Sequence, residues 1–144
     1  MKNADICCIC ETHLGGESGI IIDGYEWYGH NRQVKHKYAP KMSGGVGILV
    51  KHCISCYYHV NIIDKSVDGV LGISFVGKYT DISICIFVCY LPPESSVWGR
   101  DALSFFAHLV SQIYAGGHYD HVFMCGDFNA RLETAKIILM EWIW

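Results

Sequence analysis

Residues 121–129 read His-Val-Phe-Met-Cys-Gly-Asp-Phe-Asn, so a short apolar run leads directly into a glycine and two polar side chains. Short apolar runs bounded by turn residues are typical of buried strands. We therefore predict a strand from His121 to Cys125 that delivers Asp127 and Asn129 at its tip. Polar side chains at strand ends are where α/β folds build their sites, so this stretch indicates both a fold class and a place for chemistry.

Two earlier apolar runs end in the same way. The run from Ala4 to Cys10 leads to Glu11, and the run from Ile82 ends at Tyr90, just before a Pro-Pro pair that stops the strand. A single acid after a strand is most often a turn residue or a helix cap, and a single Tyr is most often a packed aromatic. Periodicity alone therefore leaves the roles of these polar residues open.

The remaining runs give the order of the elements. Val46 to Val50 and Val70 to Val76 are predicted strands, and Cys53 to Ile63 alternates as a half-buried strand does. A helix is predicted from about Val97 to Ala115, capped by Ser95 or Ser96, because its apolar residues recur at helical spacing. Many strands, one crossover helix and a final strand predict an α/β sandwich with mixed sheets.

Composition and charge narrow the class. The 144 residues suit one domain, and 51% of them are apolar, which argues against disorder. The formal net charge is −3, whereas a protein held to nucleic acid mainly by phosphate contacts is usually basic. A metal ion or a local patch must therefore offset the charge. The one basic cluster lies between His30 and Lys41, and a solvated loop is favoured there over a DNA-gripping surface.

Most of the eight cysteines lie inside apolar runs, where free Cys behaves as a small hydrophobic residue. The lone Cys53-x-x-Cys56 pair is interpreted in the same way, because a zinc site needs about four ligands. No secretory signal opens the chain, and no apolar stretch approaches the roughly 20 residues of a spanning helix. We therefore expect an intracellular protein, nuclear or cytoplasmic, that is not secreted and has no membrane partner.

Four motifs share their order and approximate spacing with one known family. They are Cys10-Glu11-Thr12-His13-Leu14, the glycine-rich run from Ser43 to Val50, Tyr90-Leu91-Pro92-Pro93, and the run from Cys125 to Arg131. Together they resemble the endonuclease/exonuclease/phosphatase superfamily. The residues of the first and third motifs resemble those of the endonuclease domain of non-LTR (LINE-type) retrotransposons. The resemblance implies a partial four-layer α/β sandwich of the DNase-I-like type.

The resemblance also implies a role for each site residue. Glu11 would be the ligand of Mg²⁺ or Mn²⁺, and Tyr90 would bind the scissile phosphate. Asp127 would orient or deprotonate the attacking water, and Asn129 would hydrogen-bond the phosphate and also orient Asp127. The implied partner is DNA, with a reverse transcriptase domain in the parent polyprotein.

The resemblance is incomplete at both ends. Only ten residues precede Glu11, where the family has a further strand, and the family's terminal Ser-Asp-His element is missing from the sequence. We therefore expect residues 1–132 to be a truncated domain that is inactive alone, because catalytic groups that act as a unit are non-additive. Residues 133–144 form an apolar tail unlike the family. A one-nucleotide frameshift near Leu132 is our hypothesis for its origin.

Two other functions stay open on the sequence. A phosphatase or deadenylase-like member of the same superfamily would use the same residues for another phosphate ester. A non-catalytic pseudogene product or binding fragment would keep the motifs without using them.

Overall fold

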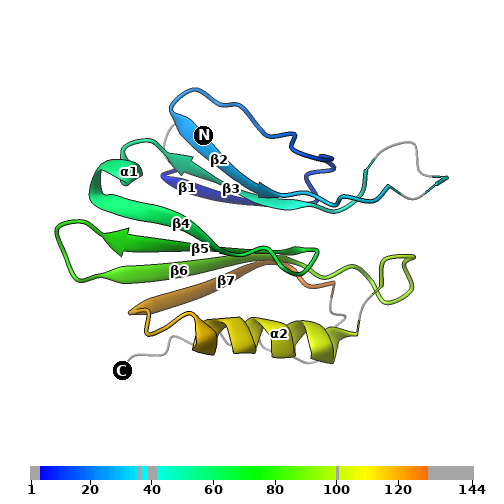
Figure 1. Ribbon diagram of the computed structural model, residues 1–144. Coiled ribbons are helices and arrows are strands. Elements are labelled where there is room, and N and C mark those ends of the chain that lie inside the picture. Colours follow the sequence, from blue (N-terminus) through cyan, green and yellow to red (C-terminus); the bar gives the residue numbers. More distant parts are fainter. Residues whose placement is uncertain (1–3, 36, 39–41, 100, 130–144) are drawn as a thin grey trace.

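The structure is a computed structural model that describes residues 4–35, 37–38, 42–99 and 101–129. Two β-sheets pack face to face, and a helix covers the outer face of the second sheet (Figure 1). The elements are β1 (Ile6–Cys10), β2 (Tyr25–His30), β3 (Val46–Lys51), α1 (Ile54–Tyr57), β4 (Tyr58–Asp64), β5 (Val70–Gly77), β6 (Ser83–Tyr90), α2 (Ala102–Ala115) and β7 (His121–Asp127).

The two sheets differ in strand direction. The first sheet has the order β1-β3-β2 and is antiparallel throughout. The second has the order β4-β5-β6-β7, and its last pair, β6 and β7, is parallel. A parallel pair needs a crossover connection, and α2 supplies it. The predicted sandwich with one crossover helix is therefore confirmed, and the second sheet is the mixed one.

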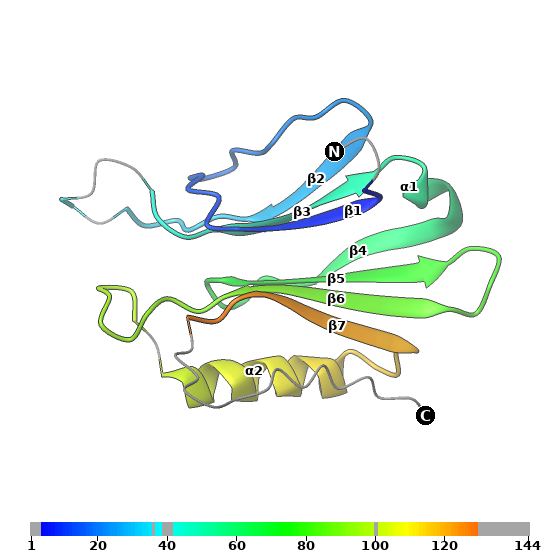
Figure 2. The ribbon, with the colours of Figure 1, turned by 180° about the vertical axis from the view of Figure 1, so that it is seen from behind.

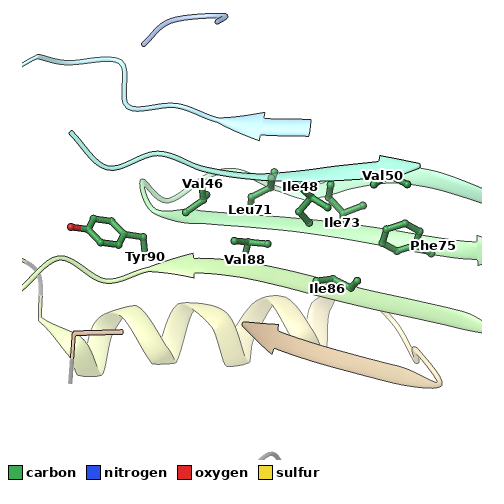
Figure 3. Packing of buried hydrophobic residues seen from close by; sticks show 9 residues of the cluster. All are labelled: Val46, Ile48, Val50, Leu71, Ile73, Phe75, Ile86, Val88 and Tyr90. Atoms are coloured by element: carbon green, nitrogen blue, oxygen red, sulfur yellow. The ribbon is translucent and has the colours of Figure 1, made fainter. Parts of the chain in front are cut away.

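Strand β6 lies between two hydrophobic cores. Its side chains alternate, so Ile86, Val88 and Tyr90 face the first sheet while Cys85, Phe87 and Cys89 face α2. Figure 3 shows the core between the sheets, with Tyr90 at its end and the hydroxyl directed away from Val88. A strand buried on both faces has no polar alternation, which explains its unbroken apolar sequence.

Three predicted elements are wrong in their bounds. The helix begins at Ala102 because Asp101 is its N-cap and accepts a hydrogen bond from the Ser104 amide. The stretch from Cys53 to Ile63 is the single turn α1 followed by β4, and Cys53 and Cys56 are exposed rather than in a core. The stretch from Ile20 to Tyr28, predicted as a strand or a strand pair turning at Asp23-Gly24, has a turn at residues 23–24 and a strand only from Tyr25.

The predicted apolar tail, residues 133–144, lies outside the described residues. Within the described ranges, no helix has the length and apolar content that a membrane span requires.

Candidate functional site

The four predicted site residues lie at one end of the sandwich. Glu11 follows β1, Tyr90 ends β6 and Asp127 ends β7. The parallel register sets Tyr90 directly beside Asp127, and Asn129 follows two residues later. The short helix α1 lies at the opposite end in both views (Figures 1 and 2).

Glu11 and Tyr90 meet across the two sheets. The Tyr90 hydroxyl donates to Oε1 of Glu11 at 2.5 Å, although the residues are 79 positions apart in sequence. Nearby, the Cys10 thiol donates to the carbonyl of Cys89 at 3.3 Å, again from the first sheet to the second. Burial, the hydrogen bond to Glu11 and the charges of Glu11 and Asp127 raise the pKa of Tyr90 well above its usual value. Tyr90 is therefore a neutral hydrogen-bond donor at physiological pH.

The backbone that carries Glu11 is held in an uncommon conformation. Glu11 and His13 have φ of 51° and 56°, a region that non-glycine residues rarely adopt. The amides of Thr12 and His13 donate to the carbonyls of Gly45 and Gly44, at 3.1 and 2.9 Å. Strained backbone of this kind gathers at functional sites, where the surrounding structure holds it in place. The glycine-rich run thus fixes the Glu11 turn through its main chain.

Asp127 and Asn129 form a second strained turn. Asn129 has φ 44°, and its backbone amide donates to Oδ1 of Asp127 at 2.9 Å. Its side-chain amide donates to the Leu91 carbonyl at 3.0 Å. The side-chain amide carries two N–H groups, so one remains for a ligand. Asn129 therefore contacts Asp127 with its backbone amide, while its side chain links the turn to Leu91, directly after β6.

The carboxylates at this end fit one kind of cation. Mg²⁺ is usually held by one or two carboxylates, with waters and substrate phosphate completing its shell. Glu11 and Asp127 offer such a set of hard oxygen donors. Among the described residues, no group of three or more His, Cys, Asp or Glu side chains is arranged to hold a metal. Two carboxylates are too few for a closed zinc site, whereas hard oxygen donors are the kind of ligand that Mg²⁺ prefers.

Arg32, predicted to lie in a solvated basic loop, is instead buried with 5% of its surface exposed. Its Nε pairs with Oδ2 of Asp68 at 2.7 Å, and its Nη1 donates to Oγ of Ser43 at 2.9 Å. Its guanidinium carbon lies 4.3 Å from the centre of the Trp98 ring. No periodic pattern marks a buried Arg inside a polar loop, so this role left no signal in the sequence.

A second polar cluster lies between β4 and α2. The buried Asp64 accepts hydrogen bonds from the Ser66 hydroxyl at 2.7 Å and from Nε2 of His108 at 2.8 Å. Burial acts to raise the pKa of Asp64, but the bonds from Ser66 and His108 outweigh it and leave that pKa below the usual value. His108 does not lie between the other two as a base would in a catalytic triad, so we interpret the cluster as structural.

Comparisons with known proteins identify a matching family and a similar fold. The sequence matches the Endonuclease/Exonuclease/phosphatase family over residues 1–137. Among solved structures, the fold is similar to the human Nocturnin catalytic domain with bound sulfate anion, with a TM-score of 0.53 and 16% sequence identity. That match covers 90% of this chain and 53% of the Nocturnin chain, so this chain spans about half of its length. No curated protein matches the sequence. At this identity the likeness shows the fold alone, and that fold is the expected DNase-I-like sandwich.

Proposed function

Since this chain belongs to the endonuclease/exonuclease/phosphatase family, we propose that it forms part of the catalytic domain of a Mg²⁺-dependent phosphodiesterase that nicks DNA for a non-LTR retrotransposon. The observation that carries the proposal is the contact of Glu11 with Tyr90 beside Asp127. Enzymes of this family generally depend on a divalent metal. The wording of the Glu11 and Tyr90 motifs supports the retrotransposon subtype, with DNA and a reverse transcriptase domain as partners.

Each side chain has a task that its contacts support. A Mg²⁺ ion held by Glu11 would neutralise charge that develops on a phosphate and help to lower the pKa of an attacking water. The Tyr90 hydroxyl, neutral and fixed by burial, donates to a phosphate oxygen when substrate displaces Glu11 from it. Asp127, with Oδ1 held by the Asn129 amide, orients the water. The second N–H of the Asn129 side chain donates to the phosphate.

The 144-residue chain alone is proposed to be inactive. The described residues supply four of the groups, and the sequence contains no Ser-Asp-His element to supply a histidine. Supercoiled plasmid incubated with the chain and Mg²⁺ should therefore stay intact, as it should with Asp127→Ala. Nicking by the wild type that Asp127→Ala abolishes would overturn the proposed inactivity, while keeping the nuclease assignment.

Cation binding tests the site without requiring activity. Mn²⁺ reports directly by electron paramagnetic resonance, and Glu11→Gln should weaken its binding by about tenfold or more, since one charged ligand is lost. Glu17→Gln, at an exposed loop position outside the site, is the matched control and should bind Mn²⁺ as the wild type does. Equal affinity in Glu11→Gln and the wild type would remove Glu11 as the metal ligand.

Two measurements address the subtype. Binding of duplex DNA and of single-stranded poly(A) RNA, compared in Ca²⁺ to suppress hydrolysis, should favour the duplex for a DNA-nicking ancestor. A preference for the RNA would support the deadenylase-like alternative. Sequencing the gene tests the origin: a reverse transcriptase frame downstream is expected, and so is a family-like continuation in the shifted frame after Leu132. A shifted frame without that continuation would reject the frameshift.

A further inference from the structure

Polar contacts tie the two sheets together at the end that carries the candidate site. Arg32 lies just after β2 of the first sheet, and its partner Asp68 lies just before β5 of the second. Two residues before Arg32, Nδ1 of His30 donates to the Val70 carbonyl at 2.7 Å. An ion pair and a hydrogen bond therefore cross from sheet to sheet at this end. They add to the contacts of Glu11 with Tyr90 and of Cys10 with Cys89, whereas the core between the sheets is apolar.

The contacts of Arg32 are those of a structural residue rather than of a ligand-binding group. Its guanidinium meets Asp68 on one edge and Ser43 on another, while its face stacks on Trp98. A buried charge is costly unless it is paired and hydrogen-bonded, and all three contacts compensate that cost. A planar fork that stacks and bonds along two edges is a property of Arg and not of Lys.

The partners of Arg32 lead directly to the two halves of the site. On one side, Ser43 precedes Gly44 and Gly45, whose carbonyls hold the turn that carries Glu11. On the other side, Asp68 precedes Gly69, whose carbonyl accepts the Tyr90 amide at 2.7 Å. The Arg32–Asp68 pair therefore stands between the backbone that holds Glu11 and the backbone that holds Tyr90.

We propose that Arg32 is a positioning residue of this site. Its ion pair with Asp68 fixes the first sheet against the second at the site end and so holds the Glu11 carboxylate against the Tyr90 hydroxyl. The inference rests on the proposed function only where it treats the contact of Glu11 with Tyr90 as part of a catalytic site. The positioning of the two side chains requires neither metal nor substrate.

The test reads the Glu11–Tyr90 contact in the full chain. Tyr90 is replaced by 3-fluorotyrosine, and its ¹⁹F chemical shift is measured with Glu11 and with Glu11→Gln. The difference between the two shifts reports the contact, because a phenol that donates to a carboxylate differs electronically from one that donates to an amide or to water. Arg32→Gln and Asp68→Asn should each remove most of this difference. The charge of Arg32 can also act directly on the Tyr90 ring. That effect is the same with Glu11 and with Glu11→Gln, so it cancels in the difference between the two shifts.

Lys51→Gln is the matched control, because Lys51 forms an exposed ion pair with Asp5 within the first sheet, at 3.1 Å and at the far end of β3. It should leave the ¹⁹F difference unchanged. A full difference in folded Arg32→Gln and Asp68→Asn would overturn the proposal. If neither variant unfolds cooperatively, Ser43→Ala decides, since it keeps the ion pair and removes one contact of the guanidinium. It should reduce the difference, and an unchanged difference would equally reject the role. A failure of Mn²⁺ binding would count against the proposed function alone.

Discussion

Gly126 offers a sharp test of how β7 delivers Asp127. Its φ of +147° is one that L side chains rarely adopt, and a Cβ placed there falls well inside 3.0 Å of the Cys89 carbonyl oxygen, closer than real Cβ atoms approach. Cys89 is its partner in the parallel ladder between β6 and β7. The obstacle is backbone, which cannot rotate aside as a flexible side chain could, so Gly126→Ala must push the two strands apart.

The loss of stability expected for Gly126→Ala is the sum of two energetic costs. Placing a Cβ at an unfavourable φ costs roughly 1–2 kcal/mol, and forcing extra volume into a packed position typically costs about 1–3 kcal/mol more. We expect the free energy of unfolding of Gly126→Ala, measured by urea denaturation, to fall by about 2–5 kcal/mol on these terms. The separation of the strands should also displace Asp127 from Tyr90.

Gly117→Ala isolates the conformational part of that cost. Gly117 also has a positive φ, +93°, but no heavy atom lies within 4 Å of the position that an alanine Cβ would occupy. We expect a loss of about 1–2 kcal/mol, the conformational cost alone. If the two alanine variants were equally stable, the close approach of β7 to Cys89 would not be what requires glycine, and the reasoning would fail.

Three further outcomes are expected. Phe87→Ala should lower the free energy of unfolding by about 3–5 kcal/mol in urea, because it empties a fully buried ring position between the second sheet and α2; a loss below about 1 kcal/mol would contradict that packing. The lowered pKa of Asp64 stabilises the fold above about pH 4 and ceases to do so as pH falls through the folded-state pKa. The stability gap between wild type and Asp64→Asn should therefore be wide at neutral pH and close in acid, and a gap independent of pH would reject this linkage. Gly45→Ala should weaken Mn²⁺ binding because its Cβ would strike the Thr12 hydroxyl, whereas Gly24→Ala, with open space at a similar φ, should not; equal affinities would separate the glycine-rich run from the site.

The sequence predicted the elements whose position depends on the burial of neighbouring residues. The apolar runs predicted β3, β5 and β6 closely, because a strand buried on one or both faces must be apolar at those positions. The strand β7 was also predicted in the right place, but the prediction that it is buried was wrong, because most of its residues are exposed. The start of α2 was misjudged because a capping Asp101 competes with nearby serines, and only the three-dimensional turn decides between them. Cys53 and Cys56 were misjudged because one exposed helical turn mimics weak alternation.

The sequence predicted the side chains of the candidate site but not the contacts that hold them in place. Glu11, Tyr90, Asp127 and Asn129 were predicted because each lies at or just after the end of a strand, and the resemblance to the family implied their roles. Their supports were not found. The Arg32–Asp68 pair joins loops 36 positions apart, and the Asn129 backbone bond depends on a positive φ. Contacts of this kind are set by how the sheets pack and leave no periodic trace in the chain.

The long sequence separation between Glu11 and Tyr90 has a consequence for biosynthesis. Glu11 leaves the ribosome 79 residues before its partner, an interval of roughly 4–16 s at typical translation speeds of about 5–20 residues per second. During that time β1 can pair with β3, but β6 and β7 do not yet exist. The nascent chain therefore presents the apolar face of its first sheet to solvent, where chaperones that recognise exposed hydrophobic surface would meet it before the second sheet closes over it.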